Sequence, residues 1–264
     1  MYRFDYQAPD SVEAVLVALR KNDEAKIVAG GMTLLPTMKL RLARPDVLID
    51  INRIGSLAGI RENDGAIVIG AMTRHADVAA SKLVRNRIPG LADLAEAIGD
   101  PQVRNRGTMG GSVANNDPAA DYPAGLVGLG ATVITDRREI AADNFFTDMF
   151  ETALEDDEII TAVRFPIPKR AAYMKFPNPA TRYAIVGVMV AEACDRIRVA
   201  VTGAAPCVFR VAAMEDALGK DFTPDAIASI AVDGAEFNED IHASAEYRAH
   251  LVNVMARRAV TTLG

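Results

Sequence analysis

A pair of adjacent glycines follows an apolar stretch twice in this sequence, in "IVAGGMTLLP" around Gly30-Gly31 and in "GTMGGSVANN" around Gly110-Gly111. Glycine tolerates positive φ, and because it has no Cβ a ligand can come within hydrogen-bonding distance of successive backbone N–H groups. Loops of this kind hold phosphates. One glycine pair is most simply a tight turn between a strand and a helix, but the repetition favours a pyrophosphate held between two glycine turns.

The two loops differ from the common nucleotide-binding motifs. Neither matches GxGxxG or GxxxxGK[ST], which argues against a Rossmann dinucleotide site and against a P-loop. Neither contains a basic residue that could neutralise a triphosphate. The site that these loops predict is therefore built from backbone N–H groups.

Polar side chains gather around the second loop. Thr108 and Ser112 can donate hydroxyls there, and Asn115 can donate an amide. Asp117 precedes a proline and is predicted to be the N-cap of the next helix. Asp121 lies one turn further on, where it either caps a neighbouring loop or accepts a hydrogen bond from a ligand hydroxyl.

Composition excludes several classes of protein. The chain has 264 residues with 50% hydrophobic composition, enough for a large core, and its net charge of −6 argues against a nucleic-acid partner. Cys194 and Cys207 have no CxxC spacing and the histidines are scattered, so no zinc site and no iron–sulfur cluster is expected within the chain. We interpret both cysteines as reduced core thiols.

The chain is also expected to lack targeting and membrane-spanning segments. Its first residues, "MYRFDYQAPDS", have neither the basic nor the apolar part of a signal peptide, and no apolar run approaches the roughly 20 residues that span a bilayer. We therefore expect a cytoplasmic protein, and peripheral attachment to the inner face of the membrane stays open.

Hydrophobic periodicity predicts a mixed α and β chain with a boundary near residue 168. Before it, strands are expected in "AKIV", "DVLIDI", "GAIVIG", "GATVITD" and "EIITAVRFPIP", with helices over about 11–21, "RHADVAAS" and "IPGLADLAEAIG". His75 is expected to cap or pack near the first turn of its helix. The acidic run from Glu155 to Glu158 is interpreted as a solvated turn.

The remaining segment is predicted to be a smaller α+β domain. After a stretch rich in proline and basic residues, "PIPKRAAYMKFPNPATR", the run "YAIVGVMVAEACDRIRVAVTGAA" indicates an antiparallel hairpin of apolar strands. Helices are expected from Pro224 to about Val232 and from Ser244 to about Leu263, the second capped by Ser244.

Four segments together resemble one family: "IVAGGMTLLPTMKLRLARPDVLIDI", "IGAMTRHADV", "IGDPQVRNRGTMGGSVANNDPAADYPA" and "VAVTGAAPCVFR". They are similar to the FAD-binding medium subunit of the molybdenum hydroxylases, the group of carbon monoxide dehydrogenase and the xanthine dehydrogenases. The resemblance implies an α+β chain with a two-lobed FAD-binding domain of the p-cresol methylhydroxylase type over 1–168, its lobes at about 1–57 and 58–168. A small domain like the flavoprotein C-terminal domain follows over 169–264.

The same resemblance implies which residues contact FAD. The two loops would grip its pyrophosphate, Asp121 would reach a ribityl or ribose hydroxyl, and Tyr183 would lie by the isoalloxazine ring unless it is an ordinary strand tyrosine. Met32 replaces a residue that is often polar in the family. The implied FAD contacts are Ile27, Val28, Ala29, Gly30, Gly31, Met32, Thr33, Ile98, Thr108, Gly110, Gly111, Ser112, Asn115, Asp121, Ile160 and Tyr183. A Gly110→Val change is expected to remove the flavin selectively.

The function implied is that of an electron relay with no catalytic residue and no metal ligand in this chain. A molybdenum-pterin large subunit would oxidise the substrate, a small subunit with two [2Fe–2S] clusters would pass the electrons on, and FAD would deliver them to an external acceptor (a quinone, oxygen or NAD). The chain would be part of an obligate heteromer, a dimer of heterotrimers. The alternatives are a stand-alone FAD-dependent oxidoreductase of the same fold and a scaffold protein that has lost the flavin.

Overall fold

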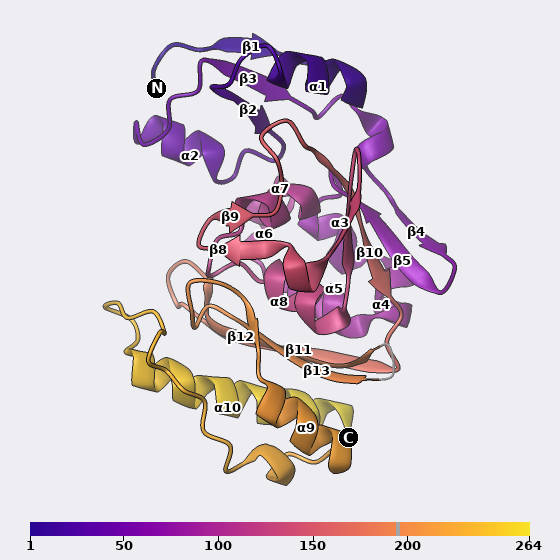
Figure 1. The fold of residues 1–264 in the computed structure, drawn as a ribbon, viewed down its shortest axis with the longest axis vertical. Coiled ribbons are helices and arrows are strands. Elements are labelled where there is room, and N and C mark those ends of the chain that lie inside the picture. The colour runs from indigo at the N-terminus through magenta and orange to yellow at the C-terminus, as the bar shows by residue number, and fades with distance from the viewer. Residues whose placement is uncertain (194–195) are drawn as a thin grey trace.

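The computed structural model describes residues 1–193 and 196–264 and stacks three layers along its long axis (Figure 1). The top layer is a small parallel sheet with α1 (Val12–Leu19) and α2 (Leu34–Lys39) beside it. Its strands, in spatial order, are β1 (Asp5–Gln7), β3 (Val47–Asp50) and β2 (Ala25–Val28). Val15, Ile49 and Leu57 belong to its separate hydrophobic core.

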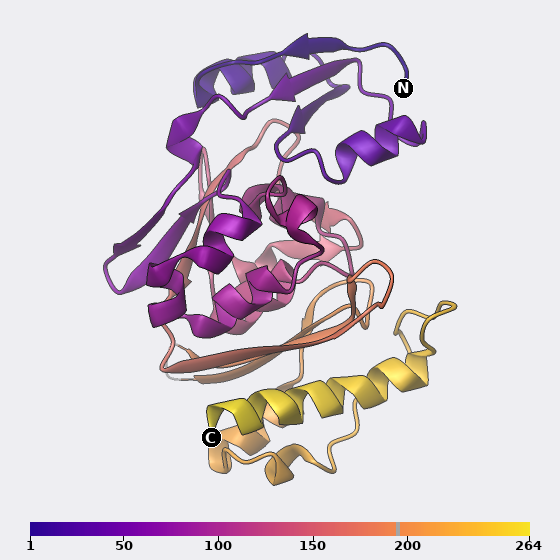
Figure 2. The same cartoon turned by 180° about the vertical axis from the view of Figure 1, so that it is seen from behind.

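The middle layer is built around an antiparallel five-stranded sheet. Its strands, in spatial order, are β4 (Ile60–Asn63), β5 (Ala66–Gly70), β10 (Ile160–Pro166), β6 (Thr132–Thr135) and β7 (Glu139–Ala141). Seen from behind in Figure 2, short helices gather against this sheet. They are α3 (His75–Ala80), α4 (Lys82–Arg87), α5 (Pro89–Glu96), α6 (Pro101–Arg104), α7 (Met109–Asn115) and α8 (Tyr122–Leu129). A short hairpin joins β8 (Phe146–Asp148) to β9 (Glu151–Thr152).

The bottom layer is a four-stranded antiparallel sheet between two sets of helices (Figure 1). Its strands are β11 (Arg170–Pro177), β12 (Ala184–Ala193), β13 (Arg196–Thr202) and β14 (Phe209–Arg210). Helices α5 and α8 contact one face, and α9 (Ala212–Lys220) and α10 (Ala245–Leu263) contact the other. Alternate residues of β12 therefore enter different cores: Met189 joins the core of the middle layer, and Val188 joins that of the C-terminal helices.

Several sequence predictions of secondary structure are confirmed. The apolar hairpin is β12 and β13, paired in register from Gly187 with Thr202 to Ala193 with Arg196. Ser244 caps α10, where its hydroxyl accepts a hydrogen bond from Tyr247 N at 3.2 Å. Both features are dictated by nearby residues: two mostly apolar strand sequences close together in the chain, and a capping hydroxyl.

Three other predictions are wrong, and β11 and α9 were not predicted. The proline-rich stretch after residue 166 contains β11, because its apolar side chains pack under α5. The segment Pro224–Val232 forms a 3₁₀ turn (Asp225–Ile227), and the helix of this region is α9, which the periodicity missed. The helix expected after Asp117 starts only at Tyr122, since Asp117 closes a local turn by accepting from Ala119 N at 2.8 Å. Ile98 belongs to the segment "IPGLADLAEAIG" that was expected to be helical, but it lies beyond the end of α5.

Candidate functional site

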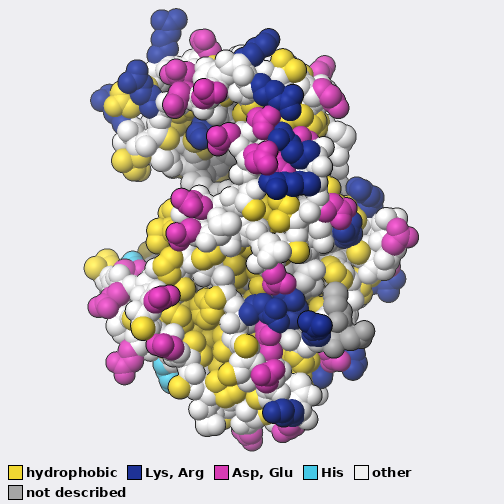
Figure 3. Space-filling view, in the orientation of Figure 1, with side chains coloured by type: hydrophobic (Ala, Val, Ile, Leu, Met, Phe, Trp, Pro, Cys, Tyr) yellow, Lys and Arg dark blue, Asp and Glu magenta, His cyan; other side chains and the backbone are white. Residues whose placement is uncertain are grey.

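A cavity of about 520 Å³ lies between the top layer and the rest of the molecule, and its wall includes residues of all three layers. Figure 3 shows the surface hollowed at this level. The sixteen residues predicted to contact FAD share one property: each of them lies on the wall of this cavity. They are Ile27, Val28, Ala29, Gly30, Gly31, Met32, Thr33, Ile98, Thr108, Gly110, Gly111, Ser112, Asn115, Asp121, Ile160 and Tyr183.

The first glycine loop leaves β2 and enters α2, and its backbone donors are free. In the part of the chain that the structure describes, the N–H groups of residues 30–33 donate to no protein acceptor. Gly31 adopts φ +71°, a left-handed conformation that favours glycine and turns the chain into α2. Successive free N–H groups around such a turn form a concavity suited to an anion.

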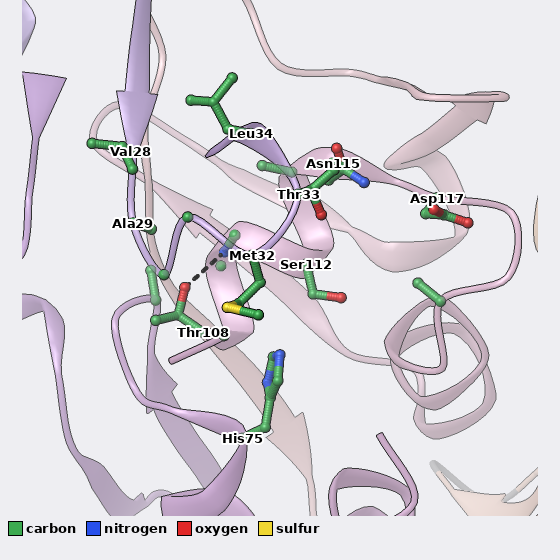
Figure 4. A pocket seen from close by; sticks show the side chains of 18 of the residues that line it. Val28, Ala29, Met32, Thr33, Leu34, His75, Thr108, Ser112, Asn115 and Asp117 are labelled. Atoms are coloured by element: carbon green, nitrogen blue, oxygen red, sulfur yellow. Dashed lines mark hydrogen bonds between the residues drawn. The ribbon is translucent and has the colours of Figure 1, made fainter. Parts of the chain in front are cut away.

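The second glycine loop uses its backbone donors inside the protein. Met109 N donates to Thr73 O at 2.9 Å, and Gly110 N donates to Ala71 O at 2.8 Å. The Thr108 hydroxyl accepts from Gly111 N at 3.3 Å, as the dashed line in Figure 4 shows. The donors that this loop can offer to a ligand are therefore side chains, above all the Ser112 hydroxyl and the Asn115 amide.

The glycines of both loops are required by close packing as well as by the cavity. A Cβ on Gly30 would lie 2.2 Å from Arg106 O, so this glycine lets the first loop touch the chain leading into the second. A Cβ on Gly110 would lie 2.6 Å from the Cβ of Ala71. Gly110→Val is therefore not a selective test of flavin binding, because it would also disturb the packing of α7 on the segment after β5.

Asp121 belongs to a buried polar cluster beneath the cavity. Its carboxylate accepts hydrogen bonds from Tyr173 Oη at 2.5 Å and from Lys175 Nζ at 2.9 Å, and all three side chains are buried. Burial raises the pKa of Asp121, while the Lys175 ammonium lowers it. Lys175 and Tyr173 were missed because β11 was not recognised as a strand, although a lone lysine in "AAYMKF" signals a buried partner.

The acidic run at 155–158 is not uniformly solvated, which corrects the expectation from sequence. Glu158 is buried on the cavity wall, and its carboxylate pairs with Arg138 at 2.7 Å. The Arg138 guanidinium, and also the N–H of Glu155, lower the pKa of Glu158 to about 2. The last residue of the run is therefore part of the cavity wall, where the ion pair with Arg138 fixes its side chain.

His75 packs at the first turn of α3, as predicted, and is 4% exposed. Its ring lies on the cavity wall, where Figure 4 shows it directed toward Met32 and Ser112. Burial, followed by the Arg104 charge, lowers the pKa of His75 to about 4, so the imidazole is neutral at pH 7. Its Nδ1 is buried without a hydrogen-bond partner.

Tyr183 is not an ordinary strand tyrosine. It precedes β12 in the turn after β11, is 46% exposed, and lies on the cavity wall beside Arg182. Burial of the hydroxyl, followed by the Asp117 and Asp121 charges, raises the pKa of Tyr183. The turn thus brings an aromatic ring from the C-terminal sheet to a cavity formed mainly by the other two layers.

The two cysteines and the metal-ligand types complete the survey. Cys207 is partly exposed and free, so it is not the core thiol that was expected, and Cys194 lies outside the described residues. Across residues 1–193 and 196–264, no three His, Cys, Asp or Glu side chains lie together as a metal site would require. In that same part of the chain no helix is long and apolar enough to cross a bilayer.

The residues of the cavity fit an extended dinucleotide such as FAD. Consecutive free N–H groups, the Ser112 hydroxyl and the Asn115 amide belong to residues that line the same cavity, a donor set suited to a pyrophosphate. Apolar side chains such as Ile27, Ile98 and Ile160 line other parts of the wall and suit ring systems.

Comparisons with known proteins identify the family. The FAD binding domain in molybdopterin dehydrogenase matches residues 2–168, and the CO dehydrogenase flavoprotein C-terminal domain matches residues 171–263. The chain is 40% identical to the carbon monoxide dehydrogenase medium chain of Hydrogenophaga pseudoflava, over 98% of this chain and 96% of that protein. It is 37% identical to the nicotine 6-hydroxylase medium subunit of Paenarthrobacter nicotinovorans, over 98% and 96%.

The fold agrees with this assignment. A solved carbon monoxide dehydrogenase from H. pseudoflava, which lacks the Mo-pyranopterin moiety of its cofactor, superposes with a TM-score of 0.90 at 38% identity. The match covers 99% of this chain and 97% of that one. Two family models and similarity along nearly the whole chain agree, and the chain belongs to the FAD-binding medium subunits of the molybdenum hydroxylases.

Proposed function

We propose that this protein holds FAD in the cavity and relays electrons from the iron–sulfur clusters of a small partner subunit to an external acceptor. The observation that carries the proposal is the row of free N–H groups at residues 30–33, on the wall of the cavity that Ser112 also lines. These donors would bind the pyrophosphate without a basic side chain in either loop. FAD itself supplies the redox chemistry.

The other cavity residues would position the rest of the cofactor. The sixteen wall residues would contact FAD, with Asp121 near a ribityl or ribose hydroxyl and Tyr183 beside the isoalloxazine. Because both Asp121 oxygens already accept from Tyr173 and Lys175, this carboxylate is held rigidly where a ligand hydroxyl would meet it. Its remaining lone pairs can accept from that hydroxyl.

The partners of the proposed relay follow from the relatives, which are medium chains and medium subunits. We propose a molybdenum-pterin large subunit that oxidises the substrate, a small [2Fe–2S] subunit, and assembly as a dimer of heterotrimers. The large subunit would set the substrate. The acceptor would be a quinone, oxygen or NAD.

The test is purification of a tagged copy from its native host with its partners, followed by analysis of flavin, iron and molybdenum and by rapid-mixing spectroscopy. We expect FAD, iron and molybdenum in one multi-subunit complex, and cluster reduction that precedes flavin reduction when substrate is added. A chain that purifies alone with FAD and turns over a soluble substrate would instead establish the stand-alone oxidoreductase. A complex that contains iron and molybdenum but no flavin would contradict the relay.

A further inference from the structure

The charged groups of the cavity wall are mostly neutralised. Of its carboxylates, Asp121 pairs with Lys175 at 2.9 Å and Glu158 pairs with Arg138 at 2.7 Å. Asp117 is the third, and no basic group lies within 4.0 Å of it in the described ranges. Without a further cation, the part of the wall near Asp117 would carry a net negative charge.

Two basic residues on the wall have no ion-pair partner. Within residues 1–193 and 196–264, no carboxylate lies within 4.0 Å of Lys26 or Arg182. Lys26 is on β2, in the top layer, just before the first glycine loop. Arg182 is in the turn between β11 and β12, next to Tyr183. The two free cations therefore come from different layers of the molecule.

The turn that carries Arg182 has an unusual conformation that its hydrogen bonds maintain. Arg182 has φ +61°, a left-handed conformation that costs a non-glycine residue stability. Asn178 organises the turn: its Oδ1 accepts from Ala180 N at 2.9 Å and from Thr181 N at 3.1 Å, and its carbonyl accepts from Arg182 N at 2.8 Å. Such strain persists where the surroundings determine it, and it is concentrated at functional sites.

The surroundings of Tyr183 show why a cation matters here. Burial, followed by the charges of Asp117 and then Asp121, raises the pKa of Tyr183, so this part of the cavity disfavours a negative charge. Electrons added to a ring system at this position would meet the same repulsion. Arg182 adjoins Tyr183 in the chain and lies, exposed, on the same cavity wall, and a guanidinium is charged at all physiological pH values.

We propose that Arg182 raises the reduction potential of FAD in this protein by placing an unpaired positive charge at the isoalloxazine end of the cavity. The inference rests on the proposed function, which puts the isoalloxazine beside Tyr183. In that function FAD would take up two electrons from the partner's iron–sulfur clusters with two protons from water, and on reoxidation both electrons would pass to the acceptor and both protons to the acceptor or to water. Charge close to the flavin ring is a recognised means by which proteins tune its electronics.

The experiment is a spectroelectrochemical titration of the flavin in the purified complex, comparing Arg182→Gln, Arg182→Gly and Arg182→Lys with the unmodified protein. At a fixed potential, loss of the charge is expected to lower the ratio of reduced to oxidised FAD about tenfold, which is about 30 mV for a two-electron couple. Arg182→Gly tolerates the positive φ, so it removes the charge without backbone strain. Arg182→Lys should keep the ratio within about twofold.

Lys26→Gln is the matched control, since it removes the other unpaired cation from the top layer. We expect its flavin to titrate like that of the unmodified protein. If Arg182→Gln and Arg182→Gly retain FAD and titrate unchanged, or if Lys26→Gln shifts the potential as much, the role of Arg182 is overturned while the FAD site stands. An unmodified complex without FAD would overturn the proposed function and this inference together.

Discussion

The two glycine loops of this protein look alike in sequence but use their backbones differently. The first loop keeps the N–H groups of residues 30–33 free, in the part of the chain that the structure describes. In the second loop, the N–H groups of Met109 and Gly110 donate to the carbonyls of Thr73 and Ala71. The N–H of Gly111 donates to the Thr108 hydroxyl. Similar motifs therefore give one loop that can bind an anion through its backbone and another that offers side chains.

The difference follows from where each loop lies. Met109 and Gly110 are the first two residues of α7 and are buried against the segment after β5, and a buried N–H must find a partner inside the protein. Met32 is 37% exposed at the cavity, where water or a ligand can satisfy the backbone. A glycine pair alone therefore does not indicate a phosphate-binding backbone, because the packing around it decides which groups stay free.

The largest effect is expected when the contact between the loops is broken. Gly30→Ala would place a methyl group 2.2 Å from the carbonyl oxygen of Arg106, and backbone on both sides would have to move. We expect a loss of about 3 kcal/mol in the free energy of unfolding, together with loss of bound FAD. Denaturant unfolding and flavin content after purification measure the two effects. Gly55→Ala is the control, since a Cβ there meets nothing within 4 Å. Equal stability of the two variants would show that the loops do not depend on this contact.

Acid should weaken the second loop through His75. Its pKa is about 4 in the folded protein and 6.5 when unperturbed, so between these values the unfolded chain binds the additional proton. The contribution of the neutral His75 to the free energy of unfolding is therefore fully present above pH 6.5. It is lost as the pH falls toward 4, by about 3 kcal/mol. Unfolding curves between pH 7 and 4 measure it, with His75→Asn as the comparison. A slope that is the same in both proteins would assign the acid sensitivity to other groups.

A cap comparison distinguishes the helices that follow the loops. Thr108 caps α7 through its hydroxyl, whereas Thr33 occupies the same position before α2 and makes no side-chain cap. Thr108→Val should cost about 1 kcal/mol of unfolding free energy, and Thr33→Val only a few tenths. Paired denaturation curves measure both. Equal losses would mean that the hydroxyl of Thr108 does not stabilise its helix.

The smallest expected effect is on FAD affinity, in variants that compare the side-chain donor of the second loop with the backbone donors of the first. Ser112→Ala removes a hydroxyl on the cavity wall and should weaken FAD binding about fivefold, the effect of one hydrogen bond of about 1 kcal/mol. Met32→Leu leaves every backbone donor of the first loop in place, so its FAD affinity should be unchanged. Flavin fluorescence titrations of the FAD-free complex measure both. A larger loss with Met32→Leu than with Ser112→Ala would reverse the proposed division between the loops.

Features set by neighbouring residues were predictable from sequence. The strands β12 and β13 are two mostly apolar stretches close together in the chain, and Ser244 is a typical N-cap residue at the start of α10. β11 was not predicted because its basic residues and the flanking prolines obscure the alternation of its side chains between two faces. That alternation becomes meaningful only when α5 covers one of those faces. α9 was missed for a similar reason, since Met214 and Leu218 become core residues only beside β13.

The sequence alone determined the family, the two-loop organisation and sixteen of the residues that line the cavity, because the family resemblance rests on short motifs. Only the tertiary structure decided that Asp121 pairs with Lys175, that Glu158 pairs with Arg138, and that Arg182 pairs with no carboxylate within 4.0 Å in the described chain. It also decided which glycine loop keeps its N–H groups free. The physical reason is that hydrogen bonds and ion pairs join residues far apart in the chain, so the number of free donors and charges is known only after folding.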